Sequence, residues 1–335
     1  MALRPVRIAR ARLRALILAA GCVLVPTTAV ATAASPEIEA TARTRFLALD
    51  CEHPADIAAA GARAGVPAPR IINLQGSVPI VTMESFAEFL MAMGYPEASL
   101  RDPQDGSLSL SSYTASDELA GMLAWYYERD AMRPMLIGHS QGGMLVVRTL
   151  HELAGGFHDA LNVYDPVTRS AQLRTTIRDP HTHAETPVVG LKIAFAAALA
   201  TGTLPRILLG QWSMLPRLRK IPDTVEEFTG FAIAWDPIAG NFATAEPYVA
   251  LGSASVRNVL LPATYSHIGL PITAHLAASP ATRAWIDGYQ PDAAAAPVPA
   301  DPAIDVRNLL LAADLWFSIR RHWCAEGQRW LRRSS

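Results

Sequence analysis

Charge, lysine and cysteine are scarce in this sequence of 335 residues. Charged residues make up 18% of it, Lys+Arg and Asp+Glu nearly balance at 29 and 30, and the only lysines are Lys192 and Lys220. A formal net charge of −1, without an acidic tail, provides no positive field that would attract nucleic acid. We therefore expect no nucleic-acid partner, and we attribute the lack of lysine to genome composition.

Cysteine occurs only at Cys22, Cys51 and Cys324. Neither Cys51 nor Cys324 has the surroundings of a catalytic thiol, and His181 and His183 have no third ligand near them, so neither cysteine catalysis nor a metal site is expected. In an oxidising compartment Cys51 and Cys324 are candidates for a disulfide that ties the two ends of the mature chain together. Two separate buried thiols are the alternative.

The first 33 residues have the pattern of a cleaved export signal. A start rich in arginine precedes an apolar run at 15–25, and small residues then lead to Ala31-Thr32-Ala33, an A-x-A cleavage pattern. An uncleaved membrane anchor is one alternative, which Pro26 and the short apolar run disfavour. A lipoprotein anchored at Cys22 is another. We predict a periplasmic or extracellular mature protein.

Strand and helix patterns alternate along the mature chain. Four apolar segments have the length and composition of buried strands: 71–74, 134–137, 231–235 and 256–261. The longer apolar run at 188–201 predicts a central buried strand with flanking structure. Apolar residues at helical spacing lie between and after them, at 82–94, 116–127, 144–153 and 273–289. This alternation predicts an α/β fold with a mostly parallel central sheet covered by helices on both faces.

The mature chain is expected to divide into four parts. Residues 34–67 predict an N-terminal helical extension, and 68–290 the α/β domain, within which 203–230 is an insertion between strands and the natural place for a lid. A linker rich in alanine and proline at 291–303 leads to an amphipathic C-terminal helix within 304–335. Because tryptophans lie beside arginines there, peripheral membrane contact is the alternative to packing on its own domain.

Gly138-His139-Ser140-Gln141-Gly142 is the strongest functional motif in the sequence. A nucleophilic serine must be lifted out of the packed sheet, and a sharp strand-to-helix turn does this while straining the backbone at the serine. Gly138 and Gly142 remove the side chains that would collide in that turn. An apolar strand precedes the motif and a helical pattern follows it, so we predict Ser140 as the nucleophile. A structural glycine-rich turn is the alternative.

A nucleophilic serine needs a base and an acid that orients the base. His267 follows the last predicted strand, and the loops at the carboxyl ends of sheet strands are where the base is expected. Asp236 ends the preceding strand and is the predicted acid, with an Asp-Pro turn as its structural alternative. Asp223 and Asp165 are the other candidates for the acid.

The tetrahedral intermediate of acyl transfer needs two backbone N–H donors to hold its oxyanion. One is expected from Gln141, directly after the nucleophile, and the other from the loop that follows an early strand. Gln75-Gly76-Ser77 fits that loop, and we assign the second donor to Ser77, with Val78 as the alternative.

These segments resemble the α/β-hydrolase superfamily. The resemblance rests on Ile72-Asn73-Leu74-Gln75-Gly76, on Gly138-His139-Ser140-Gln141-Gly142-Gly143, and on Asp236 and His267, and it spans about residues 68–290. GHSQGG is especially similar to lipase and esterase members, although many lipases have His-Gly where this chain has Gln75-Gly76. The resemblance implies hydrolysis of an ester, and less often of an amide or thioester, without a metal or organic cofactor.

The sequence therefore predicts an exported carboxylic-ester hydrolase that acts on a small-molecule or lipid ester. The apolar residues of the expected lid would suit an acyl chain. Three alternatives remain: an acyltransferase on the same scaffold, a serine peptidase, and a catalytically silent envelope protein that binds an apolar ligand.

Overall fold

The computed structural model describes residues 36–53, 57–78, 80–242, 245–291, 297–299 and 301–333. The predicted export signal, including Cys22, lies outside the described residues, as does part of the predicted linker. The elements below all belong to the unit formed by Pro36–Ser335.

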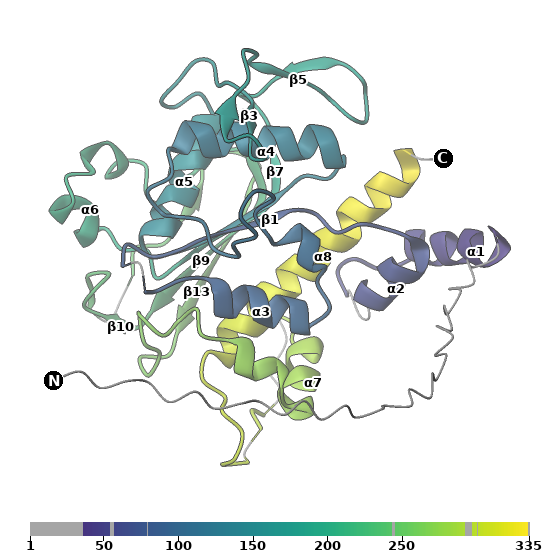
Figure 1. The fold of residues 1–335 in the computed structure, drawn as a ribbon. Coiled ribbons are helices and arrows are strands. Elements are labelled where there is room, and N and C mark those ends of the chain that lie inside the picture. The colour runs from purple at the N-terminus through teal and green to yellow at the C-terminus, as the bar shows by residue number, and fades with distance from the viewer. Residues whose placement is uncertain are drawn as a thin grey trace, which may run out of the picture. The chain divides into compact units, whose positions relative to one another are not determined.

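A five-stranded sheet lies at the centre of this unit (Figure 1). Its strands, in spatial order, are β1 (Ile71–Leu74), β2 (Met135–His139), β7 (Ile193–Leu199), β9 (Val225–Ile233) and β13 (Ser255–Leu261). Every neighbouring pair is parallel. The predicted α/β class with a parallel sheet is confirmed, and the loops that follow the strands meet at one edge of the sheet.

Both faces of the sheet are covered by helices. Successive residues of a strand point to opposite faces, and Phe195 of β7 joins the buried cluster that contains Trp316, whereas Ala196 joins the cluster that contains Leu123 and Val147. The helices α4 (Ser116–Asp130) and α5 (Gln141–Leu153) therefore cover one face, and the other face is covered by α3 (Glu84–Ala92), α7 (Pro280–Gly288) and α8 (Leu309–Arg333).

The remaining elements are short. The helical ones are α1 (Pro36–Leu47), α2 (Ile57–Ala64), η1 (Glu97–Ser99), α6 (Leu204–Leu208), η2 (Trp212–Met214) and η3 (Ala274–Ala277). The strands outside the central sheet are β3 (Tyr164–Asp165), β4 (Ser170–Ala171), β5 (Thr176–Arg178), β6 (Glu185–Pro187), β8 (Lys220–Ile221), β10 (Trp235–Asp236), β11 (Asn241–Phe242) and β12 (Val249–Ala250).

Two predicted boundaries are wrong. The insertion expected at 203–230 ends earlier, because β9 already begins at Val225. The helix expected at 273–289 is interrupted, and α7 begins at Pro280. Proline lacks a backbone N–H and is favoured in the first turn of a helix, which explains the break.

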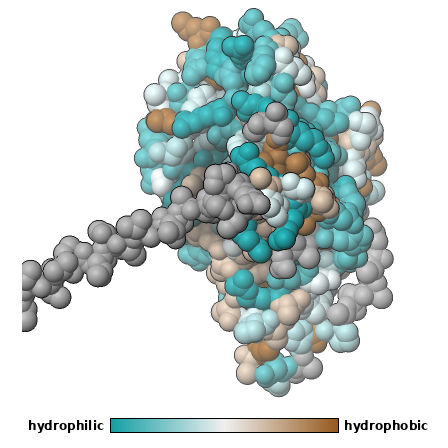
Figure 2. Space-filling view, turned by 90° about the vertical axis from the view of Figure 1, so that its right-hand side faces the viewer, coloured by the Kyte–Doolittle hydropathy of each residue, from teal (hydrophilic) through white to brown (hydrophobic). Residues whose placement is uncertain are grey.

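The C-terminal helix α8 packs on the central sheet. Trp316 and Trp323 are each 2% exposed, so neither ring is offered to a membrane surface. Cys324 of α8 is joined by a disulfide to Cys51, which follows α1. No helix within the described ranges is long and apolar enough to cross a bilayer. Figure 2 shows the side of the molecule that lies to the right in Figure 1, and hydrophilic residues cover most of the described surface there.

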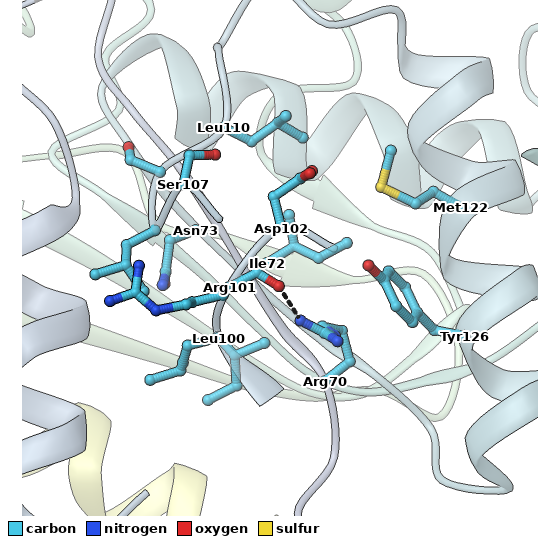
Figure 3. A pocket seen from close by; sticks show the side chains of 13 residues that line it. Arg70, Ile72, Asn73, Leu100, Arg101, Asp102, Ser107, Leu110, Met122 and Tyr126 are labelled. Carbon is cyan, nitrogen blue, oxygen red and sulfur yellow. Dashed lines mark hydrogen bonds between the residues drawn. The ribbon is translucent and has the colours of Figure 1, made fainter. Parts of the chain in front are cut away.

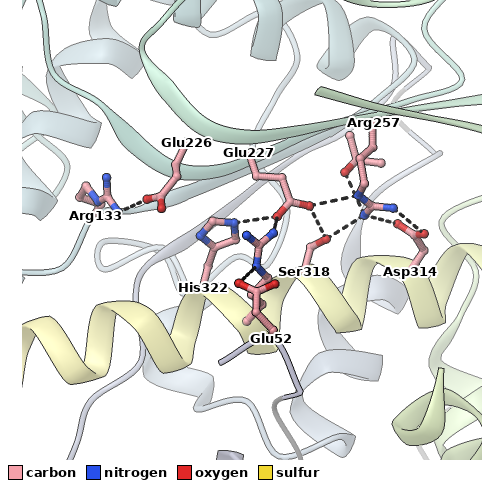
Figure 4. A network of polar contacts seen from close by, with 10 residues as sticks. Glu52, Arg133, Glu226, Glu227, Arg257, Asp314, Ser318 and His322 are labelled. Carbon is pink, nitrogen blue, oxygen red and sulfur yellow. Dashed lines mark hydrogen bonds and ion pairs between the residues drawn. The ribbon is translucent and has the colours of Figure 1, made fainter. Parts of the chain in front are cut away.

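A buried carboxylate joins α8 to the sheet (Figure 4). Glu227 of β9 accepts hydrogen bonds from Ser318 at 2.8 Å, from Arg321 at 2.7 Å and from His322 Nε2 at 3.0 Å, and it also pairs with Arg257 of β13 at 3.3 Å. Burial alone would raise the pKa of Glu227, but the hydrogen bond and charge of His322 and the charge of Arg257 lower it to about 2. Glu227 is therefore ionised and contributes to stability at neutral pH.

Replacing Glu227 with glutamine is expected to lower the free energy of unfolding by about 3 kcal/mol at pH 7, because Arg321 and His322 then lose their buried anionic acceptor, while Arg257 keeps its pair with Asp314 at 2.7 Å. Since the pKa of Glu227 lies below its ordinary value of 4.5 in the folded state, this contribution is present above pH 4.5 and is lost as the pH falls toward about 2. Urea unfolding at several pH values measures it. Glu97→Gln, which breaks an exposed pair with Arg101, is the matched control and should change stability by less than about 1 kcal/mol. Equal stability of Glu227→Gln and wild type at pH 7 would contradict the account.

Candidate active site

Ser140 stands alone between a strand and a helix, since β2 ends at His139 and α5 begins at Gln141. Its backbone has φ 53° and ψ −109°, a strained conformation for a residue with a side chain. The N–H of Ser140 donates to the carbonyl of Leu199 at 2.7 Å, and Thr201 Oγ1 donates to the carbonyl of Ser140 at 3.0 Å. These bonds from the neighbouring strand and its loop hold the turn in place.

The glycines of the motif are required by close backbone approaches. A Cβ at Gly138 would lie 2.3 Å from the carbonyl oxygen of Gly142, and a Cβ at Gly142 would lie 2.3 Å from the carbonyl oxygen of Leu74. Contacts this short are not tolerated, so any side chain at either position would open the turn. The two glycines therefore let the end of β1 pack directly against the start of α5.

Ser140, His267 and Asp236 form one hydrogen-bonded chain. Ser140 Oγ lies 3.0 Å from His267 Nε2, and His267 Nδ1 lies 2.7 Å from Asp236 Oδ2. Because a carboxylate only accepts hydrogen bonds, Nδ1 carries the proton that it donates to Asp236, and Nε2 is left to accept the proton of Ser140. The side chains of Asp236 and His267 are 1% and 8% exposed. The arrangement can deliver a deprotonated serine oxygen to an electrophile.

Asp236 is itself held in place by the loop that it begins. Its second carboxylate oxygen, Oδ1, accepts the N–H of Ala239 at 3.0 Å, which is the turn expected of an Asp-Pro sequence. Asp236 can therefore be a turn-forming residue and a partner of His267 at once, because one oxygen caps the turn and the other faces the imidazole of His267.

The two alternative acids lie elsewhere. Asp223 pairs with Lys192 at 2.8 Å and accepts from Ser253 at 2.6 Å, and both partners are exposed or half-buried. Asp165 accepts the backbone N–H groups of Val167 and Thr168 in a turn. Neither carboxylate contacts a histidine among the described residues.

His139 contributes to the site in a way that the sequence analysis missed. Its Nε2 donates to the carbonyl of His267 at 2.8 Å, and the two imidazole rings lie 5.1 Å apart. Burial, and then the neighbouring imidazole of His267, lower the pKa of His139 to about 3, so the ring is neutral. His139 is a polar residue at the end of an otherwise apolar buried strand. This pattern is the sequence signal by which its role could have been recognised. His139 acts as a positioning residue for the loop that carries His267.

If the site cleaves esters, as expected from the sequence, replacing His139 with phenylalanine should lower kcat/KM by roughly tenfold or more, because a small displacement of a catalytic group is costly. The phenyl ring fills the same space but leaves the carbonyl of His267 without its donor. Initial rates together with thermal unfolding measure the effect. The matched control is His181→Phe. His181 Nε2 makes a similar contact, at 3.1 Å, with the carbonyl of Ala131, and neither residue belongs to the hydrogen-bonded chain of Ser140. A His139→Phe protein with wild-type kcat/KM would exclude the positioning role.

The two predicted oxyanion donors lie in segments that pack against each other. Gln141 is the first residue of α5, where backbone N–H groups have no partner within the helix. A Cβ at Gly76 would lie 3.1 Å from His139 Nδ1, so the Gln75-Gly76-Ser77 loop touches the nucleophile turn. The N–H groups of Ser77 and Gln141 form no hydrogen bond within the described residues and remain available to a ligand. Their role as oxyanion donors stays a prediction.

A small cavity lies beside β1 (Figure 3). It has a volume of about 20 Å³ and is lined by Arg70, Asn73 and Tyr126 among others. Both polar atoms of the buried Asn73 amide lack hydrogen-bond partners within the described part of the chain, and the space suffices for about one water molecule. This cavity is too small for an organic substrate.

The surroundings of the site hold no metal cluster, since no three His, Cys, Asp or Glu side chains of the described part of the chain lie together as ligands would. No protein-family model matches the chain, and no curated protein matches it. Among solved structures, it is similar to RedJ with a PEG molecule bound in the active site, at 15% sequence identity and a TM-score of 0.28. That match covers 63% of this chain and 90% of the RedJ chain. Because this likeness is so weak, a function can be proposed only from the geometry of the site.

Proposed function

We propose that the protein is an exported serine hydrolase of the α/β-hydrolase type that cleaves carboxylic esters. The observation that carries the proposal is the continuous chain from Ser140 Oγ to His267 at 3.0 Å and on to Asp236 at 2.7 Å, placed at a strained strand-to-helix turn. Such a chain, at the carboxyl edge of a parallel sheet, is the arrangement that base-assisted attack by a serine requires.

The proposed reaction passes through an acyl-enzyme. His267 Nε2 takes the proton of Ser140 as Ser140 Oγ attacks the ester carbonyl, and it then gives that proton to the leaving alcohol. Asp236 stabilises the imidazolium ion that forms in between. The N–H groups of Gln141 and Ser77 stabilise the oxyanion. Water then attacks the acyl group with His267 again as the base, so the reaction needs no metal or organic cofactor.

Exposed apolar side chains near the site support an apolar acyl portion. Each of the following lies on a loop or short element that follows a strand of the central sheet: Ile80, 88% exposed, Leu208, 75%, Trp212, 61%, Trp235, 55%, and Ile268, 55%. Such side chains are costly to leave in water and mark surfaces that contact apolar ligands. We therefore propose a lipid or other apolar ester as substrate, with the segment from α6 to η2 in the role of a lid.

An assay of p-nitrophenyl esters from acetate to palmitate tests the proposed function. The mature protein is expected to release p-nitrophenol with saturation kinetics from at least one chain length. Addition of a primary alcohol separates hydrolysis from acyl transfer, because an acyltransferase would form the alkyl ester in place of the free acid. Background release at every chain length, together with an unmodified Ser140 after treatment with a fluorophosphonate, would contradict the proposal.

A further inference from the structure

A cavity of about 270 Å³ opens beside the nucleophile turn. One wall is the segment from Ser112 to Asp117, a loop that runs into the first turn of α4, another is the first part of α5 from Gln141 to Arg148, and Gln211 closes a third side. Ser112 Oγ donates to the carbonyl of Gly76 at 3.0 Å, so the loop wall touches the segment predicted to hold the oxyanion. The cavity therefore borders the nucleophile turn on the side of the predicted oxyanion donors.

A buried arginine fixes the orientation of two amides in this wall. Arg206 of α6 is 1% exposed, and its Nη1 donates to Gln141 Oε1 and, at 2.5 Å, to Gln211 Oε1. Because a guanidinium group only donates, both amide oxygens must face Arg206. The NH₂ groups of Gln141 and Gln211 form no hydrogen bond within the described residues, although both side chains line the cavity. They are free donors for the oxygen atoms of a ligand.

The two cationic side chains that line the cavity, Arg148 and His158, both face a carboxylate. Glu152, whose side chain is fully buried, accepts from Ser116 at 2.6 Å and pairs with His158 at 2.7 Å and with Arg148 at 3.9 Å. Arg206 pairs with no carboxylate within the described residues, but it lies behind the two amides and does not line the cavity. The cations that do line the cavity are matched, which disfavours an anionic ligand and leaves a neutral one.

Two further side chains point to the chemistry of that ligand. Asp117 lines the cavity, is exposed and forms no side-chain hydrogen bond within the described residues, so it can accept from a hydroxyl group. Tyr113 is 67% exposed, and an exposed aromatic ring at the mouth of a polar cavity can cover the C–H face of a sugar. Donors, an acceptor and an aromatic face together match a polyhydroxylated group.

We propose that this cavity binds a neutral polyol, such as glycerol or a sugar, that forms the alcohol portion of the ester cleaved at Ser140. The inference rests on the proposed function and adds the class of leaving group. In the reaction the acyl carbon exchanges its bond to the polyol oxygen for a bond to Ser140 Oγ, and the polyol leaves with the proton from His267. Water then releases the acid.

Hydrolysis of 6-O-octanoyl glucose, compared with p-nitrophenyl octanoate, tests the proposal. Gln211→Leu should lower kcat/KM for the glucose ester about tenfold or more beyond its effect on p-nitrophenyl octanoate, because only the polar ligand loses a half-buried donor. Tyr113→Ala, which leaves Arg206 and its amide contacts untouched, should act in the same direction. Gln104→Leu, at an exposed glutamine outside the cavity, is the matched control and should change neither substrate. Equal effects of Gln211→Leu and Tyr113→Ala on both substrates, or no effect on either, would overturn the polyol assignment.

Binding of octyl glucoside, which has no ester to cleave, separates the two proposals. Titration calorimetry on the wild type and on Gln211→Leu should show affinity about tenfold weaker in the variant, whether or not the protein hydrolyses any ester. Failure of every ester assay with this binding difference intact would contradict the proposed function and keep the polyol site. Absent binding, or equal affinity of the two proteins, would overturn the polyol site.

Discussion

Ser140→Ala is expected to lower kcat for p-nitrophenyl octanoate by roughly 10⁶-fold, as loss of the nucleophile does in serine hydrolases. His267 Nε2 contacts no other hydroxyl within the described residues, so no neighbouring side chain can take over the attack. Within the described residues Ser140 Oγ forms no other hydrogen bond, and thermal unfolding of the variant should therefore be unchanged. Initial rates at saturating substrate measure the loss.

Ser266→Ala is the matched control for this variant. Ser266 immediately precedes His267 and accepts the N–H of Gly269 at 3.3 Å, but it is no part of the chain from Ser140 to Asp236. Its replacement should leave kcat within about twofold. If Ser140→Ala kept the rate of the wild type while Ser266→Ala lost it, the nucleophile would be assigned to the wrong residue.

Asp236→Asn is expected to lower kcat by about 10⁴-fold with little change in structure. The amide that replaces the carboxylate can donate a hydrogen bond to His267 Nδ1, which favours the tautomer with the proton on Nε2. In that tautomer Nε2 cannot take the proton of Ser140. The amide also removes the negative charge, 2.7 Å away, that stabilises the imidazolium ion. The measurement is kcat for the same ester, with folding checked by circular dichroism.

Asp223→Asn and Asp165→Asn are the controls for Asp236→Asn, since neither carboxylate faces a histidine within the described residues and Asp165 also precedes a proline. Both should keep kcat within about twofold. A large loss of kcat in either control, together with an active Asp236→Asn protein, would show that the acid lies in another loop.

The nucleophile turn could be predicted from sequence because its causes are local. Gly138 and Gly142 are needed for contacts within a few residues of Ser140 and with the end of β1, and the apolar strand and the helix that flank the turn are visible as patterns. His267 and Asp236 could be predicted for a related reason. Each follows a recognisable strand, and parallel strands bring the residues after them to one edge of the sheet.

The start of β9 could not be predicted, because it depends on distant partners. Glu226 and Glu227 look like residues of an exposed loop, yet Glu227 is buried in the sheet. The side chains that make its burial tolerable, Arg321 and His322, lie on α8 almost a hundred residues later, and the sequence alone does not show that α8 crosses β9.

The directions of the side chains around the site could not be predicted from the sequence either. The role of His139 could not be predicted, because nothing in its sequence neighbours shows that its ring reaches the carbonyl of His267. The pairing of Cys51 with Cys324 was likewise undecided between a disulfide and two buried thiols. It depends on how the chain after α1 meets α8, and the structure joins the two residues.

Labelling with a fluorophosphonate, followed by peptide mass spectrometry, tests most directly whether Ser140 is a nucleophile activated by His267. The account predicts a single adduct on the peptide that contains Ser140, no adduct in Ser140→Ala, and labelling of His267→Ala slowed by at least about 10³-fold. Labelling of Ser140→Ala at the wild-type rate, or an unlabelled wild-type protein, would contradict it.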